Sequence, residues 1–347
     1  MSELVPSGVE TGGAAQLLAS ARERLSAALA DLALPDRLRL SEWQRTAIAA
    51  LLARLVRSVE DELRTALIGH FPGAAQDALD AALSSAHVPL ALPVLERAAS
   101  PWDSALIAFL MRRVEEHRLH KAAAADDGLL LELVGDGDED VAGEAMALLI
   151  AQSARLDRFQ DPVMERAELS AELEHGFVWT VAAALRRYIV GLHGIDPVAA
   201  DEAIAAATGA LLAGHDEGRS FEAMCLRLAR RLSRRDRIDD ALLVRALSGG
   251  SLPLFLAAIS VRAGIEHEAA WEILSDPDGR GVVLLLRAAG IGRDEAAAIL
   301  FRLKEDEEEA AAQLDRFDTL AAGDAHRLLG LWRTDPGYRT AIARLAS

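Results

Sequence analysis

The chain has 347 residues, of which 54 are acidic and 37 basic, and its formal net charge is −17. Hydrophobic residues make up 51% of the chain, which is enough apolar surface to exclude global disorder. The single cysteine, Cys225, excludes a disulfide framework and any Cys-based zinc or iron–sulfur site, and it fits a reducing cytoplasm. The excess negative charge argues against nucleic acid as a general partner, because phosphate binding needs positive charge.

The sequence predicts neither a secretory leader nor a membrane span. Its first residues lack a basic start followed by an apolar core. No uncharged apolar run reaches the ~18 residues that a membrane helix needs, and the longest, at 81–95, contains Pro89 and Pro93. We therefore expect a cytoplasmic protein that makes no membrane contact.

Almost the whole chain is predicted to be helical, because alanine and leucine dominate and strand-like alternation is nearly absent. Residues 1–13 contain a proline and three glycines, and we expect them to be a flexible tail. Residues 14–85 are predicted to form an N-terminal hairpin of long helices, the first at 14–31. This hairpin also offers a candidate face for a homodimer.

The second helix of the hairpin begins with a capping box at Ser41 and Gln44, in which each side chain satisfies a backbone N–H of the other residue. It ends before Gly69 and Pro72. Between these signals, apolar residues recur at intervals of three and four, which predicts one buried stripe. The stripe consists of Trp43, Ile48, Leu51, Leu52, Leu55, Val59, Leu63 and Leu67.

From residue 86 the predicted helices become short and carry frequent caps. The hexapeptide at Pro93–Ala98, PVLERA, recurs as PVMERA at Pro162–Ala167. Two-helix units that repeat every 33 to 47 residues or so are typical of helical solenoids, so we predict HEAT-like repeats over 86–215 and a C-terminal helical region over 216–347. The later helices are predicted at 176–193, 197–213, 219–235, 239–248, 251–262, 266–274, 279–289, 293–314, 322–333 and 336–346.

Motifs between about Pro93 and Leu303 resemble a bacterial family of unknown function with HEAT-like helical repeats. They lie at 93–96 with Ser100 and Pro101, and at 116–119, 137–141, 179–188, 242–247, 250–255 and 276–290. The resemblance implies an all-α fold and names no activity, cofactor or catalytic residue. The predicted fold is therefore an all-α, HEAT-like array of short antiparallel helices behind an N-terminal hairpin.

Candidate metal ligands occur only in incomplete sets. His117 and His120 share a predicted helix, but not at the spacing of a zinc-binding HExxH helix. Glu172 and His175 have the spacing of a di-metal bundle, but the second such pair is missing from the sequence. We interpret these histidines as structural or surface residues and predict no metal or other cofactor.

The acidic segment at 136–140 resembles the start of a calcium loop. Val141 replaces the glycine that this loop needs at its sixth position, and Ala147 replaces the glutamate at its twelfth. We therefore interpret Asp136 and Asp138 as helix caps.

Two further features receive a structural interpretation. Cys225 lies on an apolar stripe with Phe221, Leu228 and Leu232, so we expect it in the core rather than as a nucleophile. The glycine-rich segment 276–281 lacks the Lys-Ser/Thr of a phosphate-binding loop, and we expect a capped turn.

One basic cluster stands out in this acidic chain. The helix predicted at 219–235 carries Arg227, Arg230, Arg231, Arg234 and Arg235, and Arg237 follows it. At ~100° per residue, the first four arginines fall on one broad face opposite the stripe of Cys225. The simpler interpretation is a solvent-exposed face whose arginines pair with the acidic run 305–309. The sharper one is a docking face for an acidic or phosphorylated partner, or for nucleic acid.

The sequence contains no Walker A, GxGxxG or GxSxG motif. We therefore predict a non-enzymatic cytoplasmic protein that acts as an adaptor or regulator through protein–protein contacts. One alternative is a nucleic-acid-binding regulator that uses the helix with Arg227–Arg237. A further alternative is a small-ligand sensor or an enzyme with an unrecognised pocket.

Overall fold

The computed structural model describes residues 41–71, 76–85, 88–98, 101–122, 128–157, 161–276, 279–304 and 306–346. These residues form seventeen α-helices and no β-strand, which confirms the predicted all-α class. The predicted tail at 1–13 and the predicted helix at 14–31 lie outside the described residues. None of the described helices is both long and apolar enough to cross a membrane.

Contacts divide the chain into two units. Of the described residues, those within 41–114 and 152–220 make up one unit, here called the α2–α9 unit, and those within 115–151 and 221–346 make up the other, called the α10–α18 unit. Both units are discontinuous in sequence. The predicted boundary at 215/216 falls close to the unit boundary at 220/221, whereas the predicted boundary at 85/86 falls inside the α2–α9 unit.

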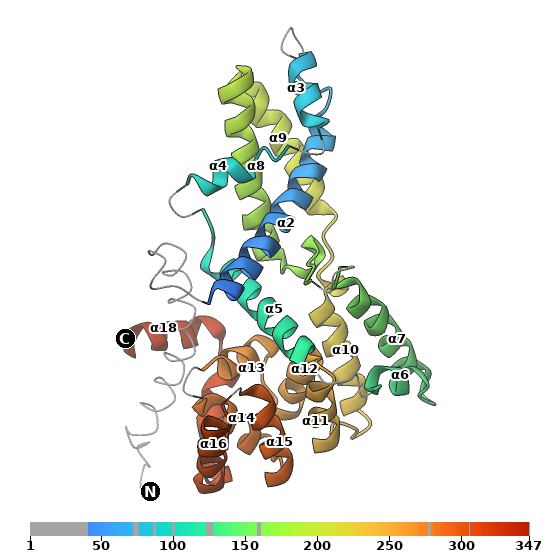
Figure 1. Ribbon diagram of the computed structural model, residues 1–347, viewed down its shortest axis with the longest axis vertical. Coiled ribbons are helices and arrows are strands. Elements are labelled where there is room, and N and C mark those ends of the chain that lie inside the picture. The colour runs from blue at the N-terminus through green and yellow to red at the C-terminus, as the bar shows by residue number, and fades with distance from the viewer. Residues whose placement is uncertain are drawn as a thin grey trace, which may run out of the picture. The chain divides into compact units, whose positions relative to one another are not determined.

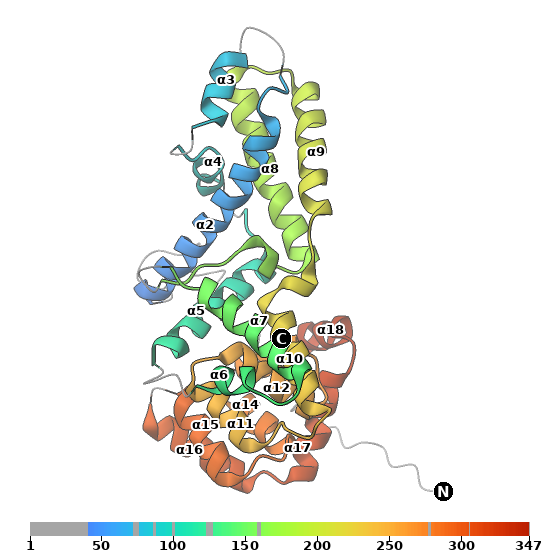
Figure 2. The same ribbon diagram turned by 90° about the vertical axis from the view of Figure 1, so that its right-hand side faces the viewer.

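Three long helices form the frame of the α2–α9 unit: α2 (Glu42–Leu67), α8 (Ala171–His193) and α9 (Pro197–Ala213). They lie side by side (Figures 1 and 2). The predicted cap is confirmed in part: Ser41 Oγ accepts a hydrogen bond from the Gln44 N–H at 3.3 Å, but the Gln44 side chain accepts from the Ser41 hydroxyl at 3.0 Å rather than from its backbone N–H. The predicted stripe of α2 is buried except for Trp43, which is exposed.

The burial of the α2 stripe takes place within one chain. Helix α2 packs on α8 and α9 of the same unit, so its apolar face is already covered. A homodimer through the N-terminal helices remains a prediction, and this stripe is not free to form it.

The shorter elements of this unit are α3 (Gln76–Leu83), α4 (Leu92–Glu96), the first part of α5 (Ser104–Ala122) and the 3-10 turns η2 (Arg166–Glu168) and η3 (Glu217–Arg219). At the start of α5, the Asp103 side chain accepts a hydrogen bond from Ala105 N–H at 2.6 Å. Ser100 itself lies outside the described residues.

The two copies of the recurring hexapeptide fold differently. The copy at 93–98 forms most of α4, whereas the copy at 162–167 begins in an isolated bridge between Leu156 and Pro162 and continues into η2. The physical reason lies in their neighbours, because Glu60 accepts the N–H groups that precede α4, while Pro162 is held next to Leu156. The hexapeptide is therefore not a structural repeat, and a HEAT-like array is not shown by this fold.

The α10–α18 unit is built around α12 (Leu252–Ala263), which is buried on nearly all sides, as its continuous apolar sequence requires. Helices α10, α11 and α13 pack on it. Besides α12, the helices of this unit are α6 (Leu129–Val134), α7 (Glu139–Ala154), α10 (Phe221–Ser233), α11 (Asp240–Ser248), α13 (His267–Leu274), α14 (Arg280–Ala288), α15 (Arg293–Leu303), α16 (Glu307–Thr319), α17 (Ala322–Leu329) and α18 (Pro336–Ala346).

Most predicted helices from 171 onward match these bounds to within a few residues, but the predicted helix at 293–314 is wrong. It breaks into α15 and α16, because Lys304 adopts an extended backbone. Asp306 then starts a new helix by accepting bonds from the N–H groups of Glu308 and Glu309, at 2.8 and 3.3 Å. The helix predicted at 322–333 ends earlier, at Leu329, and continues as the 3-10 turn η4 (Gly330–Arg333).

Candidate functional site

Helix α10 presents two chemically distinct faces. Phe221, Cys225, Leu228 and Leu232 are buried and belong to the core of the α10–α18 unit, which confirms the predicted stripe and the core position of Cys225. The arginines lie on the remaining surface of the helix, as the spacing predicts.

Most of these arginines are engaged by carboxylates of the same unit. A series of ion pairs, here called the arginine–carboxylate ladder, joins α10 and the turn after it to α7 and the turn before it (Figure 1). The pairs are Arg227–Glu144 at 3.1 Å, Arg231–Asp140 at 2.6 Å, Arg235–Asp138, and Arg237–Asp136 at 2.6 Å. The order of partners reverses along the two segments, so they run antiparallel.

The ladder corrects the predicted partner of the basic face. The acidic run 305–309 was expected to pair with these arginines, but Glu309 pairs with Lys304 at 2.6 Å. Glu305 lies outside the described residues. Three of the four partners instead come from the acidic segment at 136–140, which resembles a calcium loop in sequence, and the fourth is Glu144 of α7.

Two of the five candidate arginines remain outside the ladder. Arg230 and Arg234 are exposed, and no ion pair with another described residue is recorded for either. Arg230 lies in the last turn of α10 and Arg234 just after its end, where the Arg234 N–H donates to the Arg230 carbonyl oxygen at 3.2 Å. The structure therefore narrows the candidate docking face from five guanidinium groups to two.

The acidic side of the ladder also caps α7. The Asp138 carboxylate accepts bonds from the N–H groups of Asp140 and Val141, at 3.0 and 3.2 Å, and Asp136 accepts from Asp138 N–H at 3.0 Å. The predicted capping role is thus confirmed. The hydrogen bond from Asp138 N–H, followed by the contact with Arg237, lowers the pKa of the Asp136 carboxyl below its usual range.

The glycine-rich segment forms the expected capped turn. The Asp276 side chain is buried and accepts a bond from the Gly281 N–H at 2.8 Å. A Cβ atom at Gly281 would lie only 2.2 Å from the carbonyl oxygen of Ile273, so close packing explains this glycine. Helix capping and close packing therefore account for Asp276 and Gly281.

The histidines singled out in the sequence do not converge. His117 is buried and His120 half-buried on α5, while Glu172 and His175 are exposed on α8. His175 accepts a hydrogen bond from the Trp179 indole N–H at 3.2 Å. This contact accounts for His175 as a partner of Trp179.

Sequence reasoning missed one group with the geometry of metal ligands. Ligand atoms of Glu222, His267 and Glu268, all among the described residues, lie within 4.8 Å of one another. One imidazole and two carboxylates are ligands that zinc accepts. A contact of 3.4 Å between His267 Nδ1 and Glu222 Oε2 also accounts for the pair as an ordinary histidine–carboxylate contact. No sequence spacing signals the group, because Glu222 and His267 belong to different helices.

A second missed cluster lies in the α2–α9 unit. The buried Glu174 carboxylate contacts His215 Nδ1 at 2.8 Å and also pairs with Arg166. Arg166 in turn contacts Glu62 of α2 at 3.2 Å. The cluster links η2, α8 and the segment before η3 to α2. Among the described residues, no recorded contact of His215 involves a serine, threonine or cysteine that could act as a nucleophile. We interpret it as a structural network.

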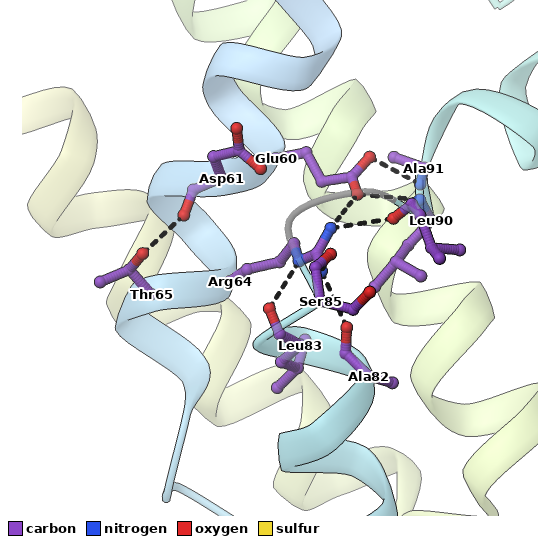
Figure 3. Close-up of polar contacts among 10 residues, drawn as sticks. Glu60, Asp61, Arg64, Thr65, Ala82, Leu83, Ser85, Leu90 and Ala91 are labelled. Atoms are coloured by element: carbon purple, nitrogen blue, oxygen red, sulfur yellow. Dashed lines mark hydrogen bonds and ion pairs between the residues drawn. The ribbon is translucent and has the colours of Figure 1, made fainter.

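The most buried ion pair of the α2–α9 unit joins Glu60 and Arg64, one turn apart on α2, at 2.9 Å (Figure 3). The Arg64 guanidinium donates to carbonyl groups at the end of α3 and after it: Ala82 at 2.8 Å, Leu83 at 2.8 Å, Ser85, and Val88 at 3.0 Å. The Glu60 carboxylate accepts from the N–H groups of Leu90 and Ala91, at 2.8 and 2.9 Å. This hub, which we call the Glu60–Arg64 hub, satisfies backbone groups at the end of α3 and the start of α4.

Together these observations define an all-helical protein whose polar clusters mainly hold helices together. Its chain belongs to the family described as "uncharacterised protein conserved in bacteria (DUF2336)", whose model matches residues 90–330, more than half of the sequence. No curated protein and no solved structure matches the chain. The family assignment confirms the resemblance to an uncharacterised bacterial family but does not show HEAT-like repeats, and it leaves function to be argued from the surface.

Proposed function

We propose that the protein acts without catalysis, as an adaptor or regulator that binds a protein partner in the cytoplasm. The observation that supports this proposal best is the pair of exposed guanidinium groups, Arg230 and Arg234, left over from the ladder on α10. The ladder holds neighbouring arginines against α7, so these two arginines, which have no recorded ion pair with another described residue, lie at the end of a helix that is fixed on its apolar and its basic side.

The proposed partner carries an acidic or phosphorylated segment. Guanidinium groups form strong, charge-assisted hydrogen bonds with carboxylate and phosphate oxygens. The rest of this chain is acidic, with a net charge of −17, and would repel such a segment everywhere except at a local positive site. Exposed charge pairs of this kind govern specificity and association rate more than affinity.

The nucleic-acid alternative receives less support from the same geometry. Four arginines of the segment are already neutralised by carboxylates in the ladder. Two free guanidinium groups would give a dependence of log K on log salt of only about −2, far below that of proteins that bind duplex DNA tightly. Salt-dependent retardation of DNA by the full chain would nevertheless reverse this ranking.

Site-specific crosslinking in the bacterial cell tests the proposal. A photo-reactive amino acid replaces Arg230 or Arg234 in the full chain, and a matched probe replaces Ala312, an exposed residue of α16 in the same unit. We expect a discrete protein adduct from positions 230 and 234 that is absent at 312. Because the probe at 230 leaves Arg234 in place, the Arg234→Glu change should then remove the adduct formed at 230.

A second charge reversal serves as the control. Arg57→Glu with Arg219→Glu changes two exposed arginines in the α2–α9 unit and should leave the adduct at position 230 unchanged. Equal adducts at 230, 234 and 312, or an adduct that survives Arg234→Glu, would contradict the proposed docking face.

A further inference from the structure

A pocket lies between α4 and α8 in the α2–α9 unit. Its volume is about 470 Å³, within the range of about 300 to 1,000 Å³ that small-molecule sites occupy. Leu95 and Ala98 on one side and Ala184 on the other give it an apolar lining. Helix α4 packs on α8 in this region (Figure 1), so the two walls belong to a single packed unit.

Two arginines line the pocket, Arg97 just after α4 and Arg187 on α8. Both are exposed, and neither has a recorded ion pair with another described residue. The contrast with the adjacent Arg186 is informative, because Arg186 forms a two-point contact with Asp201 of α9. In a chain with a net charge of −17, two unneutralised guanidinium groups in one small pocket are a positive site for an anion.

The pocket also contains a flat aromatic surface. Trp179 lines it and is 37% exposed, although it is one of the largest apolar side chains in the protein. Its indole N–H donates to His175 Nε2 at 3.2 Å, which restrains the ring. A restrained, accessible indole offers a stacking surface for a planar ring, and ring pairs of this kind contribute affinity beyond simple burial.

We propose that the pocket between α4 and α8 binds a small organic anion that carries a planar ring, with its phosphate or carboxylate group at Arg97 and Arg187 and its ring at Trp179. The apolar lining accommodates the remainder of the ligand. This site belongs to a different unit from the exposed arginines of α10, so tests of ligand binding here are independent of tests of the proposed partner-binding function.

Adenosine monophosphate is the probe for this proposal, because it combines a phosphate with a planar base. Isothermal titration of the full chain should show saturable binding. Adenosine, which lacks the phosphate, and inorganic phosphate, which lacks the ring, should each bind at least about tenfold more weakly, since a charge-assisted bond contributes roughly one factor of ten or more. Binding should also quench tryptophan fluorescence in the parent chain but not in the Trp179→Phe variant.

Matched variants assign the binding to this pocket. Arg97→Gln or Arg187→Gln should each weaken binding of adenosine monophosphate at least about tenfold. The double control Arg57→Gln with Arg219→Gln removes the same charge from exposed positions of the same unit and should change nothing. All four arginines are exposed, and circular dichroism of each variant verifies that the fold is retained.

Three results would overturn the proposal. The first is no saturable binding of adenosine monophosphate at millimolar concentration. The second is equal binding of adenosine, or of inorganic phosphate, which would mean that one half of the recognition is absent. The third is binding that survives Arg97→Gln together with Arg187→Gln, which would place the ligand elsewhere. None of these results alters the crosslinking expected at position 230.

Discussion

Two arginine–carboxylate systems in this protein use the same chemistry in different surroundings. In the Glu60–Arg64 hub the two residues are only 1% and 3% exposed. In the arginine–carboxylate ladder the arginine side chains are between 33% and 40% exposed. The hub also satisfies backbone groups of two other helices, whereas the ladder mainly satisfies its own charges.

The difference in burial decides what each system does. Charges taken out of water lose their hydration, so removing one partner of a buried pair leaves an uncompensated charge in the interior. Charges at the surface are hydrated and screened whether or not they are paired. The hub therefore determines the fold around α3 and α4, and the ladder determines which arginines of α10 and the turn after it are left without an ion pair among the described residues.

The largest expected effect comes from Arg64→Met. The change leaves the Glu60 carboxylate buried without its cation and leaves the carbonyl groups of Ala82 and Leu83 without a donor. Breaking a buried pair in this way costs about 3 to 5 kcal/mol of unfolding free energy. Urea denaturation followed by circular dichroism measures the loss, with Arg57→Met, an exposed arginine of the same helix, as the control.

Replacing both members of the hub sharpens the comparison. A buried pair that satisfies only itself can be exchanged for apolar residues at little cost. Here the protein with Glu60→Gln and Arg64→Met should still have a clearly lower unfolding free energy than the parent, because the carbonyl groups at the end of α3 and after it lose their hydrogen-bond donor. A double variant as stable as the parent would show that these backbone bonds contribute little.

A much smaller effect is expected from Arg231→Ala in the ladder. Its partner Asp140 is more than half exposed, so the side chain regains water when the pair is lost. Exposed pairs of this kind contribute about 0.2 to 1 kcal/mol, and salt screens them. Urea denaturation at low and high salt should show a small loss that shrinks as salt rises. A loss as large as that of Arg64→Met would remove the distinction between hub and ladder.

The smallest expected effect is the pH dependence that Asp136 contributes. Because its pKa is lowered in the folded protein, by the Asp138 N–H bond first and Arg237 next, the ionised form stabilises the fold. This contribution is present above the ordinary pKa of 3.8 and is lost as the pH falls through the lower, folded-state pKa. The Asp136→Asn variant should therefore lose less stability than the parent on acidification below pH 4 or so. Parallel acid titrations of the two proteins, followed by circular dichroism, would measure the difference, and identical curves would contradict the shift.

Local sequence signals predicted most of the fold. The N-cap at Ser41, the cap at Asp138 and the stripe of Cys225 each depend on residues within about one or two helical turns, and each is confirmed. The prediction of helix boundaries and repeats failed where another local signal or the tertiary surroundings had the larger effect. Asp306 capped a new helix inside an alanine-rich stretch, and two nearly identical hexapeptides folded differently because their surroundings differ.

The polar clusters lay beyond the reach of such signals. The arginines of α10 form an obvious cluster in the sequence, but their carboxylate partners lie most of a hundred residues earlier. Helix capping already explained those carboxylates, so nothing in the sequence suggested pairing them with the arginines. The pocket of Arg97, Trp179 and Arg187 likewise joins segments that are far apart in the chain. Neither pairing leaves a periodic pattern in a single sequence.

The sequence by itself determined the positions of most helices to within a few residues and the apolar faces of α2 and α10, because those properties follow from propensity, capping and spacing within a few residues. Only the tertiary structure decided which charges are neutralised and which stay free. Packing placed α7 beside α10 and left Arg230 and Arg234 exposed, and it placed α4 against α8 with Arg97 and Arg187 unpaired among the described residues. Electrostatic pairing depends on distance in space, which the order of residues along the chain does not fix.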